Sequence, residues 1–110
     1  MSDAPGSPLA DAMNRLWAKY LPQMEERVGT LKKAAESLEI GTLTKTGQEQ
    51  AGADAHKLAG VLGTFGLKEG TELAREAETL YGDSLDGDPA VASRLRAIAE
   101  QLRSMIANRP

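Results

Sequence analysis

MEERVGTLKKAAESL, residues 24–38, is the stretch that decides the fold class of this 110-residue chain. Its apolar side chains recur in alternating steps of four and three residues, at Met24, Val28, Leu31, Ala35 and Leu38. That spacing places them on one face of an α-helix, which completes a turn about every 3.6 residues. Charged side chains fill the opposite face, at Glu25, Glu26, Arg27, Lys32, Lys33 and Glu36. Because an amphipathic helix must bury its apolar face, the stretch predicts a fold of packed helices.

The segment before this helix has a helical pattern of its own that ends at a proline. Ser7 is predicted to cap it, with Pro8 in its first turn, a pairing typical of helix starts. Its apolar positions are Leu9, Met13, Leu16, Trp17 and Tyr20. Pro22 interrupts the pattern, because proline lacks the N–H group of a helical hydrogen bond and clashes with the preceding turn. We therefore expect a short separate helix, and a second helix over about residues 22–38 that Gly41 follows.

Three further helices are predicted. The third is capped by Thr44 or Thr46, continues to about residue 65 and stops at Gly66. The fourth covers about residues 68–81. Its inward residues and its closing glycine are Leu73, Ala77, Leu80 and Gly82.

The last helix follows a turn-rich loop over residues 82–87. Asp88 and Pro89 repeat the pairing of a cap with a first-turn proline. Its apolar positions are Val91, Leu95, Ile98, Leu102, Met105 and Ile106. No segment alternates as a strand would, so the chain is expected to be all-α: an antiparallel four-helix bundle with an additional short N-terminal helix.

Composition limits the classes of function. A chain of 110 residues forms one domain, and its net charge of −3 argues against the basic surface that nucleic-acid binding needs. It has no cysteine, its start does not form a secretory signal, and no apolar stretch is long enough to span a bilayer. We expect a cytoplasmic monomer without nucleic-acid or membrane partners, with a disordered lead-in over residues 1–6 and the bundle domain over residues 7–110.

The chain's one histidine, His56, lies on an unusual face of the predicted third helix. With about 100° of rotation per residue, the predicted core contacts fall on the opposite side: Ala51, Ala55, Leu58, Leu62 and Phe65. Asp54 also turns toward that side, and nothing in the sequence explains it. Within about 60° of His56 there are only small residues. We call them the small-residue face: Gly52, Ala53, Ala59, Gly60 and Gly63.

Glycine inside a helix lowers the stability of the helix by about 1 kcal/mol relative to alanine. Three glycines on one face therefore lower it by about 2–3 kcal/mol. Such a face leaves room for a second protein or for a bulky group on the imidazole. Structural explanations compete with this one. A lone exposed histidine is usually an ordinary surface residue. Gly60 and Gly63 can instead be explained by close helix packing or by fraying of the helix end. Gly52 can be explained by a position at the helix boundary. Lys57 and Lys68 can likewise be explained as ordinary surface cations in contact with water.

Residues 56–67, HKLAGVLGTFGL, resemble the phosphoacceptor segment of histidine phosphotransfer (HPt) domains. The shared pattern is a histidine, then an aliphatic residue, a small residue and a Gly-Leu pair, here His56, Leu58, Gly60 and Gly66-Leu67. Ala55 before the histidine also fits, and the next helix continues the likeness in Leu73, Ala74 and Glu78. The resemblance covers roughly residues 8–107. It departs from the family at Ala59, where the family usually has lysine; Lys57 is the candidate substitute but lies about 100° around the helix from His56.

The resemblance implies that His56 is a phosphoacceptor, that its Nε2 atom takes the phosphoryl group and that Glu78 lies beside it. Neutral imidazole suits this role because it is nucleophilic at physiological pH. The donor would be an aspartyl phosphate on a receiver domain, and a second receiver would take the group onward. The implied partners are therefore response-regulator receiver domains and a hybrid sensor histidine kinase.

The same resemblance implies that Mg²⁺ and a catalytic lysine belong to the receiver, so no cofactor, no metal and no autokinase activity are expected in this chain. Lys57, Ala59, Gly60 and Gly63 flank the histidine and are expected to support it or the docking of a receiver. Exposed apolar residues of the first two predicted helices are expected to complete the docking surface.

Three other functions compete with phosphotransfer. The chain could be a helical adaptor that binds signalling proteins without ever being phosphorylated. A metal- or haem-binding bundle needs several convergent ligands, and one histidine without cysteine supplies too few. A hydrolytic or transferase enzyme that uses His56 as a base needs a nucleophile and an orienting acid, and neither is evident at helical spacing.

Overall fold

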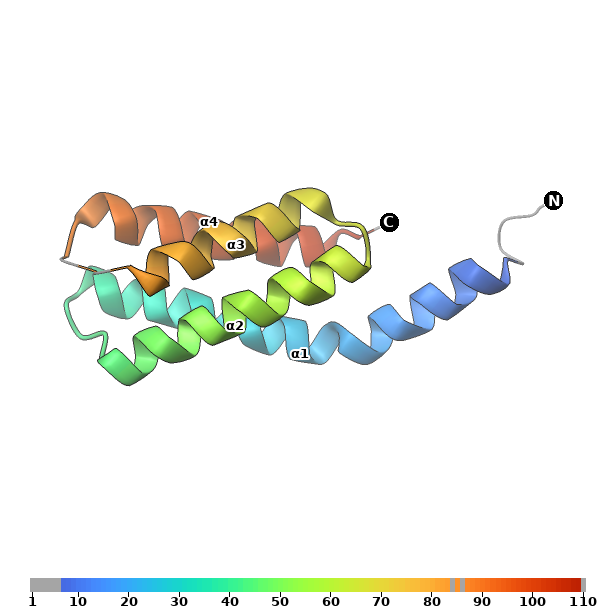
Figure 1. Ribbon diagram of the computed structural model, residues 1–110, viewed down its shortest axis with the longest axis horizontal. Coiled ribbons are helices and arrows are strands. Elements are labelled where there is room, and N and C mark those ends of the chain that lie inside the picture. The colour runs from blue at the N-terminus through green and yellow to red at the C-terminus, as the bar shows by residue number, and fades with distance from the viewer. Residues whose placement is uncertain (1–6, 84, 86, 110) are drawn as a thin grey trace.

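The computed structural model describes residues 7–83, 85 and 87–109, so the expected lead-in of residues 1–6 lies outside them. The described residues form four α-helices and no strand: α1 (Pro8–Glu39), α2 (Lys45–Thr64), α3 (Lys68–Gly82) and α4 (Pro89–Ala107). The chain runs up and down, so that α1 and α3 each pack against both α2 and α4 (Figure 1). The predicted all-helical bundle is confirmed. None of the described helices is long and apolar enough to cross a membrane.

The predicted break at Pro22 is wrong, because α1 continues through the proline as one helix of 32 residues. Pro22 and Ala18, whose carbonyl group loses its helical partner, are both exposed, so water can take that hydrogen bond. The buried side chains of α1 continue across the proline, from Trp17 to Met24 and Val28. Packing on both sides therefore keeps the helix whole, and α1 changes direction along its length instead of ending (Figure 1). The described chain has no separate N-terminal helix; the start of α1 extends beyond the other helices (Figure 1).

The other helix boundaries follow the predicted caps. The side chains of Ser7, Thr44 and Asp88 accept hydrogen bonds from backbone N–H groups in the first turns of α1, α2 and α4, at 3.2, 3.0 and 2.9 Å. Thr44, and not Thr46, is the cap of α2. Gly66 has a φ of 72°, a conformation that L side chains rarely adopt, which allows the sharp turn between α2 and α3.

The core joins all four helices and is made mostly of aliphatic side chains. Its largest fully buried members are Met24, Leu31, Leu58, Leu62, Leu95, Ile98 and Leu102. At the end of α2 the core becomes aromatic, because Phe65 packs edge-on against Trp17 with ring centroids 5.1 Å apart. The guanidinium of Arg109 lies 4.6 Å above the Trp17 ring, which fastens the C-terminal end of the chain to α1.

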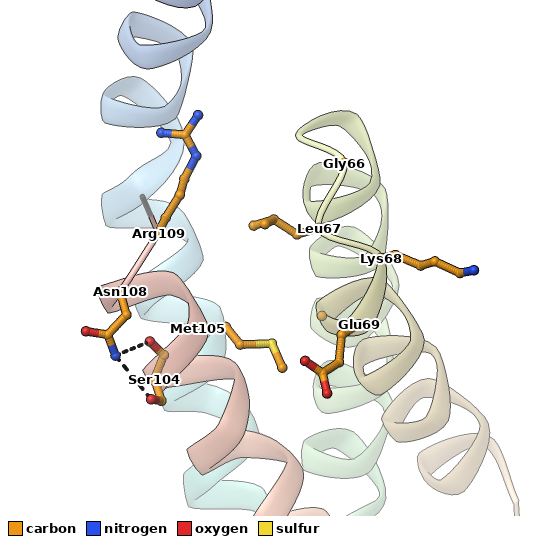
Figure 2. Close-up of a pocket in the computed structure, with 9 residues that line it drawn as sticks. Gly66, Leu67, Lys68, Glu69, Ser104, Met105, Asn108 and Arg109 are labelled. Carbon is orange, nitrogen blue, oxygen red and sulfur yellow. Dashed lines mark hydrogen bonds between the residues drawn. The ribbon is translucent and has the colours of Figure 1, made fainter.

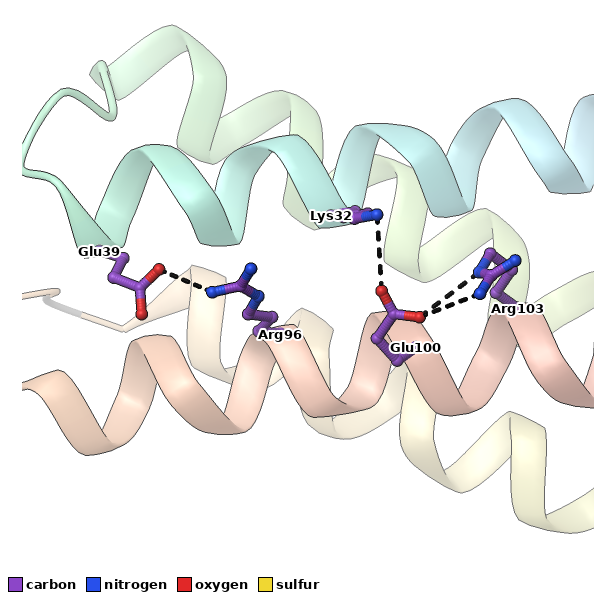
Figure 3. A network of polar contacts seen from close by, with 5 residues as sticks. All are labelled: Lys32, Glu39, Arg96, Glu100 and Arg103. Carbon is purple, nitrogen blue, oxygen red and sulfur yellow. Dashed lines mark hydrogen bonds and ion pairs between the residues drawn. The ribbon is translucent and has the colours of Figure 1, made fainter.

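Ion pairs run along the outer seam between α1 and α4 (Figure 3). Glu100 on α4 forms an ion pair with Lys32 of α1 at 3.6 Å and accepts from Arg103 of its own helix at 3.3 Å. Arg96 donates to Glu39, at the end of α1, at 2.9 Å. Exposed pairs such as these contribute at most about 1 kcal/mol each, so they align the two helices more than they stabilise them.

Replacing Pro22 tests the account of α1. We expect Pro22→Ala to raise the free energy of unfolding by about 1–3 kcal/mol, because alanine restores the missing hydrogen bond at an exposed position. Urea unfolding followed by circular dichroism measures this change, with the exposed neighbour Gln23→Ala as the control. A loss of stability in Pro22→Ala would contradict the account, since it would mean that the bend itself is needed for packing.

Tyr81 offers a pH test of how α3 is packed. Its hydroxyl donates to the Leu31 carbonyl oxygen at 3.4 Å, and burial raises the pKa of Tyr81 far above its usual value of 10.0. The folded state thus favours the neutral phenol, so this contribution to stability is complete below about pH 10 and declines as the pH rises further. In urea titrations we expect wild type to lose more stability than Tyr81→Phe between about pH 10 and 12. Parallel losses in the two proteins would show that the phenol is not buried.

Candidate functional site

His56 is held by one hydrogen bond between neighbouring helices. It lies midway along α2, its side chain is 73% exposed, and its Nδ1 atom is 2.8 Å from Oε2 of Glu78 on α3. A carboxylate can only accept a hydrogen bond, so Nδ1 carries the proton and donates it. The Nε2 atom is then left with its lone pair in the exposed part of the ring. The contact thus sets the tautomer and the orientation of the imidazole together.

The histidine lines a surface hollow of about 460 Å³ between α2 and α3. We call it the histidine hollow, and its lining residues are His56, Ala59, Gly60, Arg75, Glu78 and Thr79. The structure therefore brings together three of the predicted site residues around His56, namely Ala59, Gly60 and Glu78. It also adds Arg75 and Thr79, which sequence reasoning missed. Arg75 lies three residues before Glu78 on α3, a helical spacing that could have pointed to it.

The glycines of the small-residue face are not required by packing within the described chain. A Cβ atom added at Gly60 would meet nothing within 4 Å. At Gly52 and Gly63 it would make ordinary contacts, the nearest atom lying 3.7 Å away in each case. Close helix packing therefore does not explain why these positions are glycine.

One member of the small-residue face was placed wrongly. Ala59 was expected beside His56 on the outward side, but it is only 5% exposed and belongs to the core. The reason is that α3 packs against that flank of α2 and covers it, which periodicity within α2 alone does not reveal. Gly60, Gly63 and Ala53 are exposed as expected.

Lys57 lies apart from the histidine hollow. It is exposed and lines a second hollow, of about 320 Å³, on the α1 side of α2, together with Tyr20 and Arg27. The structure therefore does not bring Lys57 to the hollow that His56 lines. Its role in supporting the site stays a prediction, as does the docking surface, to which exposed Leu9 and Leu16 of α1 would contribute.

The inward turn of Asp54 is explained by two polar partners. Its Oδ1 atom accepts from the Arg27 guanidinium at 3.2 Å and from the Gln50 amide at 3.1 Å. The side chain of Asp54 is buried, so these bonds satisfy a charge that would otherwise be costly to bury. Asp54 therefore joins α1 to α2 and has no contact with the histidine hollow.

A third hollow, of about 450 Å³, lies at the other flank of the bundle, between the start of α3 and the end of α4. Figure 2 shows that its charged side chains do not converge: Lys68 points away from α4 and Arg109 runs toward α1. The side-chain amide of Asn108 donates to the carbonyl and hydroxyl oxygens of Ser104. Within the described part of the chain, no three acidic or histidine side chains gather as metal ligands. The histidine hollow is therefore the better candidate for chemistry.

Comparison with known proteins shows which family the chain is similar to. The family model described as Hpt domain matches residues 15–107, a range that includes His56 and Glu78. Protein RcaC of Microchaete diplosiphon is 33% identical over 94 residues, which are 86% of this chain and 14% of RcaC. The chain thus spans about a seventh of that relative's length. No solved structure gives a significant match.

Removing the Glu78 carboxylate tests its hold on the ring. Since the chain has one histidine, the ¹⁵N resonances of its imidazole are assigned without ambiguity. In wild type we expect the proton on Nδ1, and in Glu78→Ala a mixture of the two tautomers, because the acceptor that fixes the proton is gone. Glu72→Ala, an exposed glutamate of the same helix, is the control. The same tautomer in Glu78→Ala as in wild type would exclude this role for the carboxylate.

Proposed function

Because this chain belongs to the Hpt domain family, whose members carry phosphoryl groups in phosphorelays, we propose that His56 is its phosphoacceptor. It receives the group from an aspartyl-phosphorylated receiver domain and passes it to another receiver. The observation that carries this proposal is the exposed imidazole whose Nδ1–H group is bound to Glu78.

The geometry supports a direct displacement at phosphorus. The Nε2 lone pair forms the new N–P bond while the P–O bond to the receiver's aspartate breaks, and the carboxylate leaves with that electron pair. The ring gains positive charge in this step, and the proton stays on Nδ1, where the Glu78 carboxylate stabilises it. When the group moves on, the same steps run in reverse with the aspartate of the second receiver as nucleophile.

The surface around His56 supports the docking of a whole domain. Gly60 and Gly63 are exposed next to the histidine, so the backbone of α2 is open to close approach. Phosphoryl transfer depends mainly on positioning and on stabilising charge, and we assign the Mg²⁺ and the catalytic lysine of that step to the receiver. This chain then acts as a monomeric carrier without autokinase activity. Receivers, one of them on a hybrid sensor kinase, would be its cytoplasmic partners.

The test is phosphotransfer from a panel of receiver domains labelled on their aspartate. We expect at least one of them to transfer label to wild type, and we expect that label to be labile in acid and stable in base, as a phosphoramidate is. His56→Gln should accept none, because the amide has no nucleophilic ring nitrogen. Electrophoresis after acid or base treatment measures both results.

A folding control accompanies this comparison. His56 is exposed, so His56→Gln is expected to unfold at the same temperature as wild type. If wild type stays unlabelled while both proteins bind the same receivers equally well, the phosphorelay proposal is wrong and the chain is a helical adaptor. Label on both proteins would place the acceptor at another residue.

A further inference from the structure

Arg75 is the one cationic side chain that lines the histidine hollow, among the residues that the structure describes. It lies three residues before Glu78 and four before Thr79, so helical periodicity brings all three to the same face of α3. Ala59 and Gly60 of α2 line the hollow with them but supply only a methyl group and a hydrogen atom. Any anion that enters the hollow therefore has a single positively charged neighbour in its lining.

The charge of Arg75 is not neutralised within the described chain. Two of the acidic side chains near it on α3 are bound elsewhere: Glu76 accepts from Arg94 at 2.7 and 2.8 Å, and Glu78 accepts from His56 at 2.8 Å. Among residues 7–83, 85 and 87–109, no carboxylate oxygen lies within 4.0 Å of the exposed Arg75 guanidinium. The guanidinium is thus available to an incoming group.

The other cations near the site either bind carboxylates or line other hollows. Arg27 is bound to Asp54 at 3.2 Å on the α1 side of α2, and Lys57 lines the hollow on that same side. Arg94 is held by Glu76 through both of its hydrogen bonds. Lys68 lies at the start of α3 and lines the hollow at the far flank of the bundle. Arg75 is therefore the cation that the fold places beside His56.

A phosphoryl group on Nε2 would bring about two negative charges and three acceptor oxygens close to the Glu78 carboxylate. We propose that Arg75 binds these oxygens, so that α3 supplies both the carboxylate that orients the ring and the cation that holds the transferred group. A guanidinium suits this task because its planar fork can donate two hydrogen bonds to a phosphate at once. This inference rests on the proposed function of His56.

The two α3 side chains would act on different atoms. Arg75 contacts the non-bridging oxygens and exchanges no proton while the N–P bond forms and the receiver's P–O bond breaks. Its contribution is a lower free energy of the phosphorylated chain, and the tautomer of the free imidazole does not depend on it. Loss of Arg75 should therefore leave the tautomer of the free imidazole unchanged and destabilise only the phosphorylated chain.

The partition of the phosphoryl group between receiver and His56 measures that contribution. The proteins compared are wild type, Arg75→Gln, Arg75→Lys and, as a control with the same loss of charge, Arg15→Gln on the exposed start of α1. At equilibrium with the receiver that labels wild type, we expect Arg75→Gln to shift the partition about tenfold toward the receiver. Arg75→Lys should shift it less, and Arg15→Gln should match wild type.

A second measurement separates binding of the phosphoryl group from docking of the receiver. In the isolated phosphorylated chain, the ³¹P resonance should titrate at a higher pH in Arg75→Gln than in wild type, because a nearby cation favours the dianion. The ¹⁵N resonances of the unphosphorylated imidazole should be the same in both proteins.

Each outcome decides the matter. A wild-type partition or a wild-type ³¹P titration in Arg75→Gln overturns the inference and leaves His56 as the acceptor; a shifted partition with an unchanged titration would mean that Arg75 contacts the receiver instead. Absence of label on wild-type His56 overturns the proposed function, and this inference falls with it.

Discussion

The packing of α2 between α1 and α3 is the constraint on which the site depends. Ala51, Ala55, Leu58 and Leu62 of α2 are fully buried, and the two neighbouring helices, α1 and α3, hold them there. Because each residue turns the helix by about 100°, burying these positions leaves only one direction for His56. A rotation of α2 that moved His56 to the place of Ala55 would bury the imidazole and bring Leu58 to the exposed place of Lys57. The hydrophobic core therefore sets the exposure of the nucleophile.

Most of the fold could be predicted from local patterns. The caps at Ser7, Thr44 and Asp88 and the glycines at the helix ends follow from backbone chemistry that involves only neighbouring residues. Pro22 could not be predicted, because its local preference to break the helix is opposed by the burial of Trp17 and Met24 on either side. That burial depends on helices far away in the sequence, and tertiary packing outweighs the propensity of one residue.

The site was only partly predictable for the same reason. The angle of His56 on α2 and the likeness to the family were enough to single it out and to expect Glu78 beside it. Which flank of α2 is covered by α3 depends on the whole bundle, so the burial of Ala59 does not follow from periodicity in one helix. The partners of Asp54 likewise come from a contact between α1 and α2.

The single exposed histidine has a consequence for how partners take turns. On the proposed function, a phosphoryl group on His56 is reached through the open side of α2 and α3, so a donor domain and an acceptor domain would need the same surface. They cannot be bound together, and the donor must leave before the acceptor arrives. On the proposed function, the lifetime of the free phosphorylated chain then sets how far the signal can travel between its two encounters.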